Sequence, residues 1–255
     1  VSCAAPGHGM QAAQFIASAQ AAAGPLMATG ARVGERVEAA VHASWAAAGC
    51  NTNLGIVLLA APIARAFELA SQAGGMAAAD TAPQEPPQEP PQASPRASPS
   101  APPQASPPAP SPALAVAADA AAAWRLPATL EAVLADLDVD DARAVYRAIA
   151  MANPGGLGSA PAQDVHAEPS LPLRAAMALA AGRDTIARIY RDGYAPLIAE
   201  ARTVAAATAA AAPPAVLHAT VQALYLRLLA RWLDSHIVRK HGEAVAQNVM
   251  AAAQG

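Results

Sequence analysis

Alanine constrains this chain more than any other residue, because it supplies roughly three in ten of the 255 residues. Alanine is the strongest helix former and a weak strand former. No stretch alternates apolar and polar residues with the period of two that a half-buried strand shows. We therefore predict an all-α chain. An all-β fold is all but excluded, and a collagen-like or wholly disordered chain is excluded.

Apolar residues recur at helical spacing along most of the chain. The predicted helical stretches are 12–19, 37–45, 56–67, 130–137, 173–181, 186–202, 216–233 and 242–253. We expect Asp140 to cap a further helix that carries Val145 and Ile149. The clearest stripe lies in 216–233, where one face carries Val221, Leu224, Tyr225, Leu228, Leu229 and Trp232.

A Pro-rich segment over 81–112 interrupts the helical pattern and contains no large apolar residue. Such a composition buries too little surface to offset the entropy of ordering, so we predict a disordered insertion. It is interpreted as a tolerated surface loop, with a docking site for a Pro-binding module as the alternative. Residues 1–80 and 113–255 are predicted to pack into one multi-helix globular domain, because neither flank alone suggests a sufficient core.

Charge and composition narrow the classes of partner. The 16 basic and 19 acidic residues give a net charge of -3, which argues against a general nucleic-acid binder. The most apolar run, 56–63, contains Pro62 and is too short to span a bilayer. No signal peptide is visible, so we expect a cytoplasmic protein in which Cys3 and Cys50 are reduced thiols.

Polar residues are scarce, so the first polar cluster, residues 49–55, stands out between two helical stripes. Asn51, Thr52 and Asn53 suit a helix N-cap, and the glycines suit a turn. The functional alternative is that this helix start binds an anion through free backbone amides.

The second cluster is the glycine-rich stretch 153–158, followed by Asp164. Its glycines allow a ligand to approach the backbone closely, or they form a flexible turn. The spacing fits neither a P-loop nor a Rossmann fingerprint. Asp164 is either a loop cap or a catalytic carboxylate.

Two further clusters lie near the C-terminal end of the sequence. Arg183 and Asp184 open a predicted helix, where Asp184 suits a cap. Residues 239–242 contain Lys240, the single lysine of the chain, between Arg and His. They suit either a helix C-terminus or a clamp for phosphate oxygens. His8 is a weaker polar point, and no spacing indicates a transition-metal site.

Five ordered motifs together resemble the triphosphoribosyl-dephospho-CoA synthase family. They are NTNLG at 51–55, PGGLG at 154–158, the Asp164-Val165 pair, RDTIARIY at 183–190 and RKHG at 239–242. The resemblance covers essentially the whole chain outside 81–112.

This resemblance implies an all-α catalytic domain that transfers the triphosphoribosyl group of ATP to the 2'-hydroxyl of 3'-dephospho-CoA and releases adenine. ATP is then a substrate, we expect Mg²⁺ with it, and no tightly bound cofactor is expected. The catalytic candidates are Asp164 and Asp184, without assigned order. The nucleotide- and phosphate-binding candidates are Asn51, Thr52, Asn53, Gly55, Gly155, Gly156, Gly158, Arg183, Arg239, Lys240 and His241, with His8 as a possible addition.

The chain departs from the family pattern at three places. The citrate lyase and malonate decarboxylase branches typically have His and a basic residue where this chain has Asn53 and Leu54. They tend to have an acidic residue at the place of Gly9, and a Lys-Pro-Gly motif just upstream of Val1 that activity could require. A different acceptor in cofactor biosynthesis is therefore an alternative. A non-catalytic helical interaction module and a hydrolase that opens the same bond to water are the others.

Overall fold

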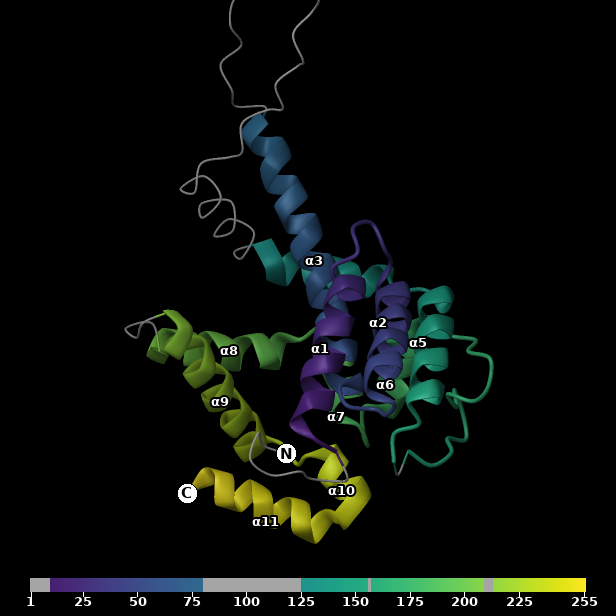
Figure 1. Cartoon of the computed structure of the whole chain (residues 1–255), viewed down its shortest axis with the longest axis vertical. Coiled ribbons are helices and arrows are strands. Elements are labelled where there is room, and N and C mark those ends of the chain that lie inside the picture. Colours follow the sequence, from purple (N-terminus) through teal and green to yellow (C-terminus); the bar gives the residue numbers. More distant parts are fainter. Residues whose placement is uncertain (1–9, 80–124, 156, 209–212) are drawn as a thin grey trace, which may run out of the picture.

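The computed structural model describes residues 10–79, 125–155, 157–208 and 213–255 (Figure 1). Within these ranges the regular structure is helical and contains no β-strand, which confirms the prediction of an all-α fold. The Pro-rich insertion, His8 and Gly156 lie outside the described residues. The labelled helices are α1 (Ala12–Leu26), α2 (Val33–Ala48), α3 (Leu54–Ala79), α5 (Val139–Ala152), α6 (Leu173–Ala180), α7 (Thr185–Arg191), α8 (Ala195–Thr208), α9 (Pro213–Arg231), α10 (Ser235–His241) and α11 (Glu243–Gln254).

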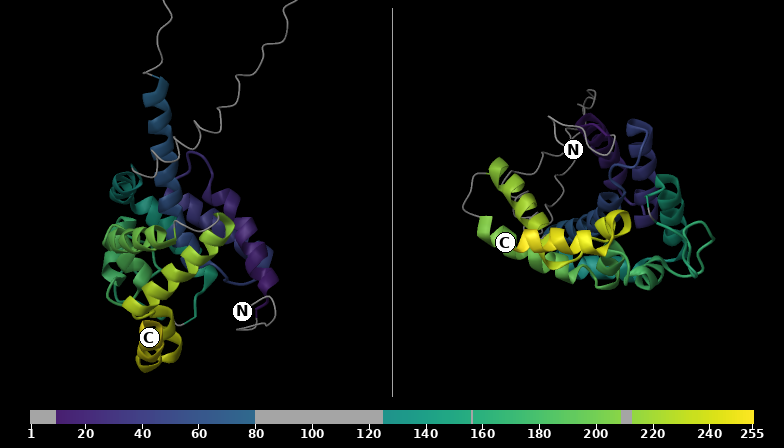
Figure 2. Two further views of the ribbon diagram at one scale, coloured as in Figure 1. Left: turned by 90° about the vertical axis from the view of Figure 1, so that its left-hand side faces the viewer. Right: turned by 90° about the horizontal axis from the view of Figure 1, so that it is seen from below.

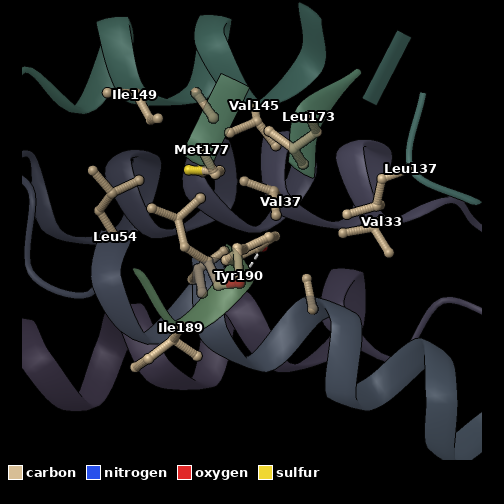
Figure 3. Packing of buried hydrophobic residues seen from close by; sticks show 14 of the residues in the cluster. Val33, Val37, Leu54, Leu137, Val145, Ile149, Leu173, Met177, Ile189 and Tyr190 are labelled. Atoms are coloured by element: carbon tan, nitrogen blue, oxygen red, sulfur yellow. Dashed lines mark hydrogen bonds between the residues drawn. The ribbon is translucent and has the colours of Figure 1, made fainter. Parts of the chain in front are cut away.

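The hydrophobic core takes residues from both sides of the insertion. Val37 of α2 packs in one cluster with Val145 of α5 and Leu173 of α6 (Figure 3). At the crossing of α2 and α5, a Cβ atom on Gly34 would lie 2.7 Å from the Cα atom of Asp141. The Asp141 carboxylate accepts a 2.8 Å hydrogen bond from the Gly34 amide, so backbone contact and a buried polar bond fix this crossing.

Helix α3 continues through Pro62, whose missing N–H leaves the Leu58 carbonyl without its usual partner in the helix. The hydroxyl of Tyr190 in α7 donates to this carbonyl at 2.6 Å, and Tyr194 donates to the next carbonyl, that of Leu59, at 3.2 Å. Burial raises the pKa of Tyr190, which lies at the centre of the core (Figure 3). Two tyrosines therefore stabilise a helix that its own proline interrupts.

Two helix boundaries differ from the sequence prediction. The helix predicted over 186–202 is wrong, because Gly193 and Tyr194 both have left-handed backbone angles and separate α7 from α8. A Cβ atom on Gly193 would also lie 2.5 Å from a Glu131 carboxylate oxygen. Asp138, not Asp140, caps α5, since its side chain accepts from the amides of Asp140 and Asp141.

Helices α8–α11 form a unit that we call the C-terminal arm. Figures 1 and 2 show it beside the core, with α11 at the end of the molecule opposite the outer end of α3. Glu200 joins α8 to α9 by ion pairs with Arg227 and Arg231. The predicted apolar face of α9 is only partly covered, because Val221 is 57% and Tyr225 59% exposed.

By length and composition, the segment Leu54–Ala73 of α3 could cross a membrane, whereas the sequence analysis expected no such segment. In this fold Val57, Ala61 and Ala66 of the segment are fully buried in the core. Packing against the other helices therefore accounts for part of its apolar character, since 44% of the apolar window is buried.

Candidate active site

A cavity of about 1230 Å³ lies where the start of α3, the loop after α5, the start of α7 and helices α9 and α10 meet. Most of its wall is apolar, and it includes the aromatic residues Phe15, Trp45, Tyr146, Tyr225 and Trp232. The predicted site residues that line it are Asn51, Thr52, Asn53, Gly55, Gly155, Arg183, Asp184, Arg239 and Lys240. Four polar clusters that are far apart in the sequence thus surround one space.

Three predicted residues in the described part of the chain do not line this cavity: Asp164, Gly158 and His241. Asp164 nevertheless lies between two residues that do, Gln163 and Val165. Its carboxylate accepts hydrogen bonds from the amides of His166 at 2.9 Å and Ala160 at 2.6 Å. These bonds hold the pKa of Asp164 below its ordinary value, and they shape the loop beside the cavity.

The NTN motif both begins α3 and joins it to α1 and α2. The Asn51 side-chain oxygen accepts from the Leu54 amide at 3.2 Å, which is a capping bond. Thr52 donates to the Ser18 hydroxyl at 2.6 Å, and Asn53 donates to the Ser44 hydroxyl at 3.0 Å. The NTN motif therefore caps α3 and also forms part of the cavity wall.

The start of α7 and helix α10 are connected by two polar contacts. The Asp184 carboxylate accepts from the Ala187 amide at 3.0 Å and forms a 2.7 Å ion pair with Arg239. The Thr185 amide donates to the Ser235 hydroxyl at 3.1 Å. These contacts place the basic last turn of α10 at the cavity.

The positive charge at this end is only partly neutralised. Among the described residues, Arg183 and Lys240 have no ion-pair partner within 4.0 Å, and the buried Nε of Arg239 has no hydrogen-bond partner. Lys240 lies beside the glycine-rich loop, since a Cβ atom on Gly155 would be 3.7 Å from its Cε atom. Guanidinium and ammonium groups of this kind bind phosphate oxygens.

The sequence of the chain was compared with those of known protein families. The family described as ATP:dephospho-CoA triphosphoribosyl transferase matches residues 1–87 and 112–255. The chain belongs to this family. No curated protein and no solved structure gives a significant match. The unmatched residues, 88–111, fall within the Pro-rich insertion.

The carboxylates of this family member do not form a metal site within the described residues. No group of three or more potential ligands is present there. Asp184 and Asp234 are the two carboxylates among the residues that line the cavity, and each already accepts amide hydrogen bonds at a helix start. The described residues therefore do not fit a Mg²⁺ ion that the protein alone would hold.

Sequence reasoning did not select several residues that line the cavity or support its wall. Ser18 and Ser44 lie on buried helix faces and hold the NTN motif, and neither was among the predicted site residues. Ser235 belongs to the polar stretch Asp234-Ser235-His236 that precedes Arg239 in the sequence, but it was not selected as a site residue, because a serine at a helix start is ordinary. A signal for Ser18 existed, because it is a polar residue within the otherwise apolar pattern of α1.

Proposed function

We propose that this chain transfers the triphosphoribosyl group of ATP to the 2'-hydroxyl of 3'-dephospho-CoA and releases adenine. The chain belongs to this transferase family, and one observation of its structure supports the proposal most directly. Residues from four separate motifs, represented by Asn51, Gly155, Asp184 and Lys240, line a single cavity. A non-catalytic module has no need to gather them.

The triphosphate end of ATP fits the side of the cavity that holds Arg183, Arg239 and Lys240. Triphosphate carries about four negative charges, so it needs several cations. Arg183 and Lys240 are not engaged in ion pairs with the described residues. We expect Mg²⁺ to enter bound to the triphosphate, because the cavity does not supply a ligand set of its own.

The chemistry is a substitution at the ribose C1' atom. The acceptor oxygen forms a bond to C1', the bond from C1' to adenine breaks, and the hydroxyl proton is balanced by the proton that adenine gains. Such a displacement passes through a state with positive charge on the sugar ring. Asp184 is our candidate for stabilising that charge or taking the proton, because its carboxylate lines the cavity. Asp164 is then a positioning residue for the loop.

A different acceptor is the second candidate, and one observation favours it. Leu54, at a position where other branches have a basic residue, is 7% exposed and packs in the core. Asn53, where those branches have His, is held by Ser44. Two phosphate ligands are thus replaced by neutral residues, which suits an acceptor with less negative charge at this wall.

The test is to incubate the protein with ATP and Mg²⁺, with and without 3'-dephospho-CoA, and to measure free adenine by chromatography. We expect adenine only when the acceptor is present. Adenine without any acceptor would identify a hydrolase instead. The assay uses the protein with its upstream residues restored, and no adenine under either condition would then favour the different acceptor or a binding role.

A pair of matched variants tests the role of Asp184. Asp184→Asn keeps an oxygen that can cap α7 but removes the charge, so we expect turnover to fall by at least about 100-fold. Asp234→Asn makes the same change at the cap of α10 and should leave most of the turnover. Equal losses in the two variants would contradict a catalytic role for Asp184.

A further inference from the structure

We propose that the side-chain oxygen of Asn53 is a fixed hydrogen-bond acceptor that selects nucleotides carrying a donor group at this wall, with Ser44 as its positioning residue. The donor is either the amino group of the adenine base or a ribose hydroxyl. This inference rests on the proposed function, because it assumes that ATP occupies the cavity.

The orientation of the Asn53 amide is set by two partners that only accept. Its Nδ2 donates to the Ser44 hydroxyl at 3.0 Å and to the Ser18 carbonyl at 3.4 Å. The single proton of the Ser44 hydroxyl is already donated to the same Ser18 carbonyl at 3.3 Å. While Ser44 donates to Ser18 it has no proton for Asn53, and a flipped amide would place its oxygen against the Ser18 carbonyl and draw the Ser44 proton away from that carbonyl.

Both partners are rigidly enclosed, which makes the orientation costly to change. Ser18 is 0% and Ser44 is 3% exposed, and they belong to the packed pair of α1 and α2. A buried hydroxyl or carbonyl that loses its hydrogen bond cannot turn to water instead. The amide nitrogen of Asn53 is thus retained on the core side.

The oxygen of Asn53 remains available to a ligand. Among the described residues it has no hydrogen-bond partner, yet it is not one of the buried unsatisfied atoms, so solvent reaches it. Asn53 also lines the cavity. The accessible part of this amide is therefore an acceptor, and it favours a ligand group that donates.

Asn51 presents the opposite polarity two residues earlier. Its oxygen accepts from the Leu54 amide, which leaves its Nδ2 donor for the cavity. One neutral donor and one neutral acceptor are then presented by the same motif at the cavity wall. This combination suits the hydrogen-bonding edge of a base or sugar rather than a phosphate.

The experiment measures dissociation constants of four nucleotides for the wild type and for variants, by calorimetry with Mg²⁺. The nucleotides are ATP, inosine triphosphate, 2'-deoxy-ATP and 3'-deoxy-ATP, so that each analogue lacks one candidate donor. We expect one analogue to bind the wild type about tenfold more weakly than ATP. That analogue identifies the group that Asn53 recognises.

In Asn53→Ala the dissociation constant of that analogue, divided by the dissociation constant of ATP, should fall close to one. Ser44→Ala is a smaller change and should reduce the same ratio while ATP still binds. This variant tests the inference if Asn53→Ala does not fold. Asn248→Ala, an exposed amide on α11, is the matched control and should keep the wild-type ratio. An unchanged ratio in both cavity variants, or equal binding of all four nucleotides by the wild type, would overturn the inference and leave the transferase proposal intact. A wild type that does not bind ATP would overturn both.

Discussion

At the scale of single residues, the cavity contains positive charge that the protein itself leaves without a counterion. Arg239 is paired with Asp184, but Lys240 has no ion-pair partner among the described residues. Lys240 is exposed at the cavity wall, so its ammonium group is free to form a hydrogen bond with an anion that enters the cavity.

Lys240→Ala should therefore weaken ATP binding by about 10- to 100-fold, the range for losing a hydrogen bond to a charged group. Calorimetric titration with ATP and Mg²⁺ measures the change. Arg202→Ala removes an exposed cation of α8 that does not line the cavity, so it controls for net charge. If Lys240→Ala binds ATP as the wild type does, Lys240 is not part of a phosphate site.

Much of this residue-level arrangement could be predicted from the sequence, because scarce polar residues in an Ala-rich chain are conspicuous. Asn51, Asp184 and Lys240 were selected in this way, and they line the same cavity. The position of Asp164 could not be predicted. Whether a loop carboxylate faces a cavity or binds its own backbone amides depends on local loop geometry, and here it accepts two such amides.

At the scale of elements, α3 and α7 depend on each other through the Leu58 carbonyl. Tyr190→Phe should lower the free energy of unfolding by about 1–3 kcal/mol, because it leaves a buried acceptor without a partner. In a Pro62→Ala background residue 62 regains an N–H that can bond this carbonyl, so the same change should cost less. Urea unfolding of the wild type, both single variants and the double variant gives the coupling. Equal costs of Tyr190→Phe in both backgrounds would show that Pro62 does not create the need for this hydroxyl.

The existence of most elements followed from apolar periodicity and alanine content, whereas two boundaries did not. Gly193 and Tyr194 end α7 in a left-handed conformation, although the sequence over 186–202 has a continuous helical pattern. Val221 and Tyr225 belong to the predicted apolar face of α9, yet both side chains are exposed. Periodicity identifies an apolar face but not the partner that covers it.

At the scale of the whole molecule, ion pairs between helices make the stability of the fold depend on pH. Hydrogen bonds from Arg227 and Arg231 lower the pKa of Glu200, which joins α8 to α9. Burial opposes the shift at Glu68, but hydrogen bonds from Gly30, Arg65 and Arg36 still lower its pKa. Carboxylates with lowered folded-state pKa values stabilise the fold fully above the ordinary value of 4.5, and they lose this contribution as pH falls through the folded values.

The midpoint of thermal unfolding should accordingly change little between pH 7 and pH 5 and fall below about pH 4. Circular dichroism over this range measures it. Glu200→Gln removes one titrating group from the arm, so its midpoint should be lower at pH 7 and should fall less on acidification. A wild-type midpoint at pH 3.5 equal to that at pH 7 would contradict this account.

The place where the insertion joins the fold has a practical consequence. The described chain stops at Ala79 in α3 and resumes at residue 125, and the outer end of α3 lies at the end of the molecule opposite α10 and α11 (Figures 1 and 2). Residues 88–111 also have no counterpart in the family match. A fluorescent label or an affinity tag placed between those residues would therefore change none of the residues that match the family. This stretch is thus the natural handle for immobilising or tracking the protein without altering any residue that lines the cavity.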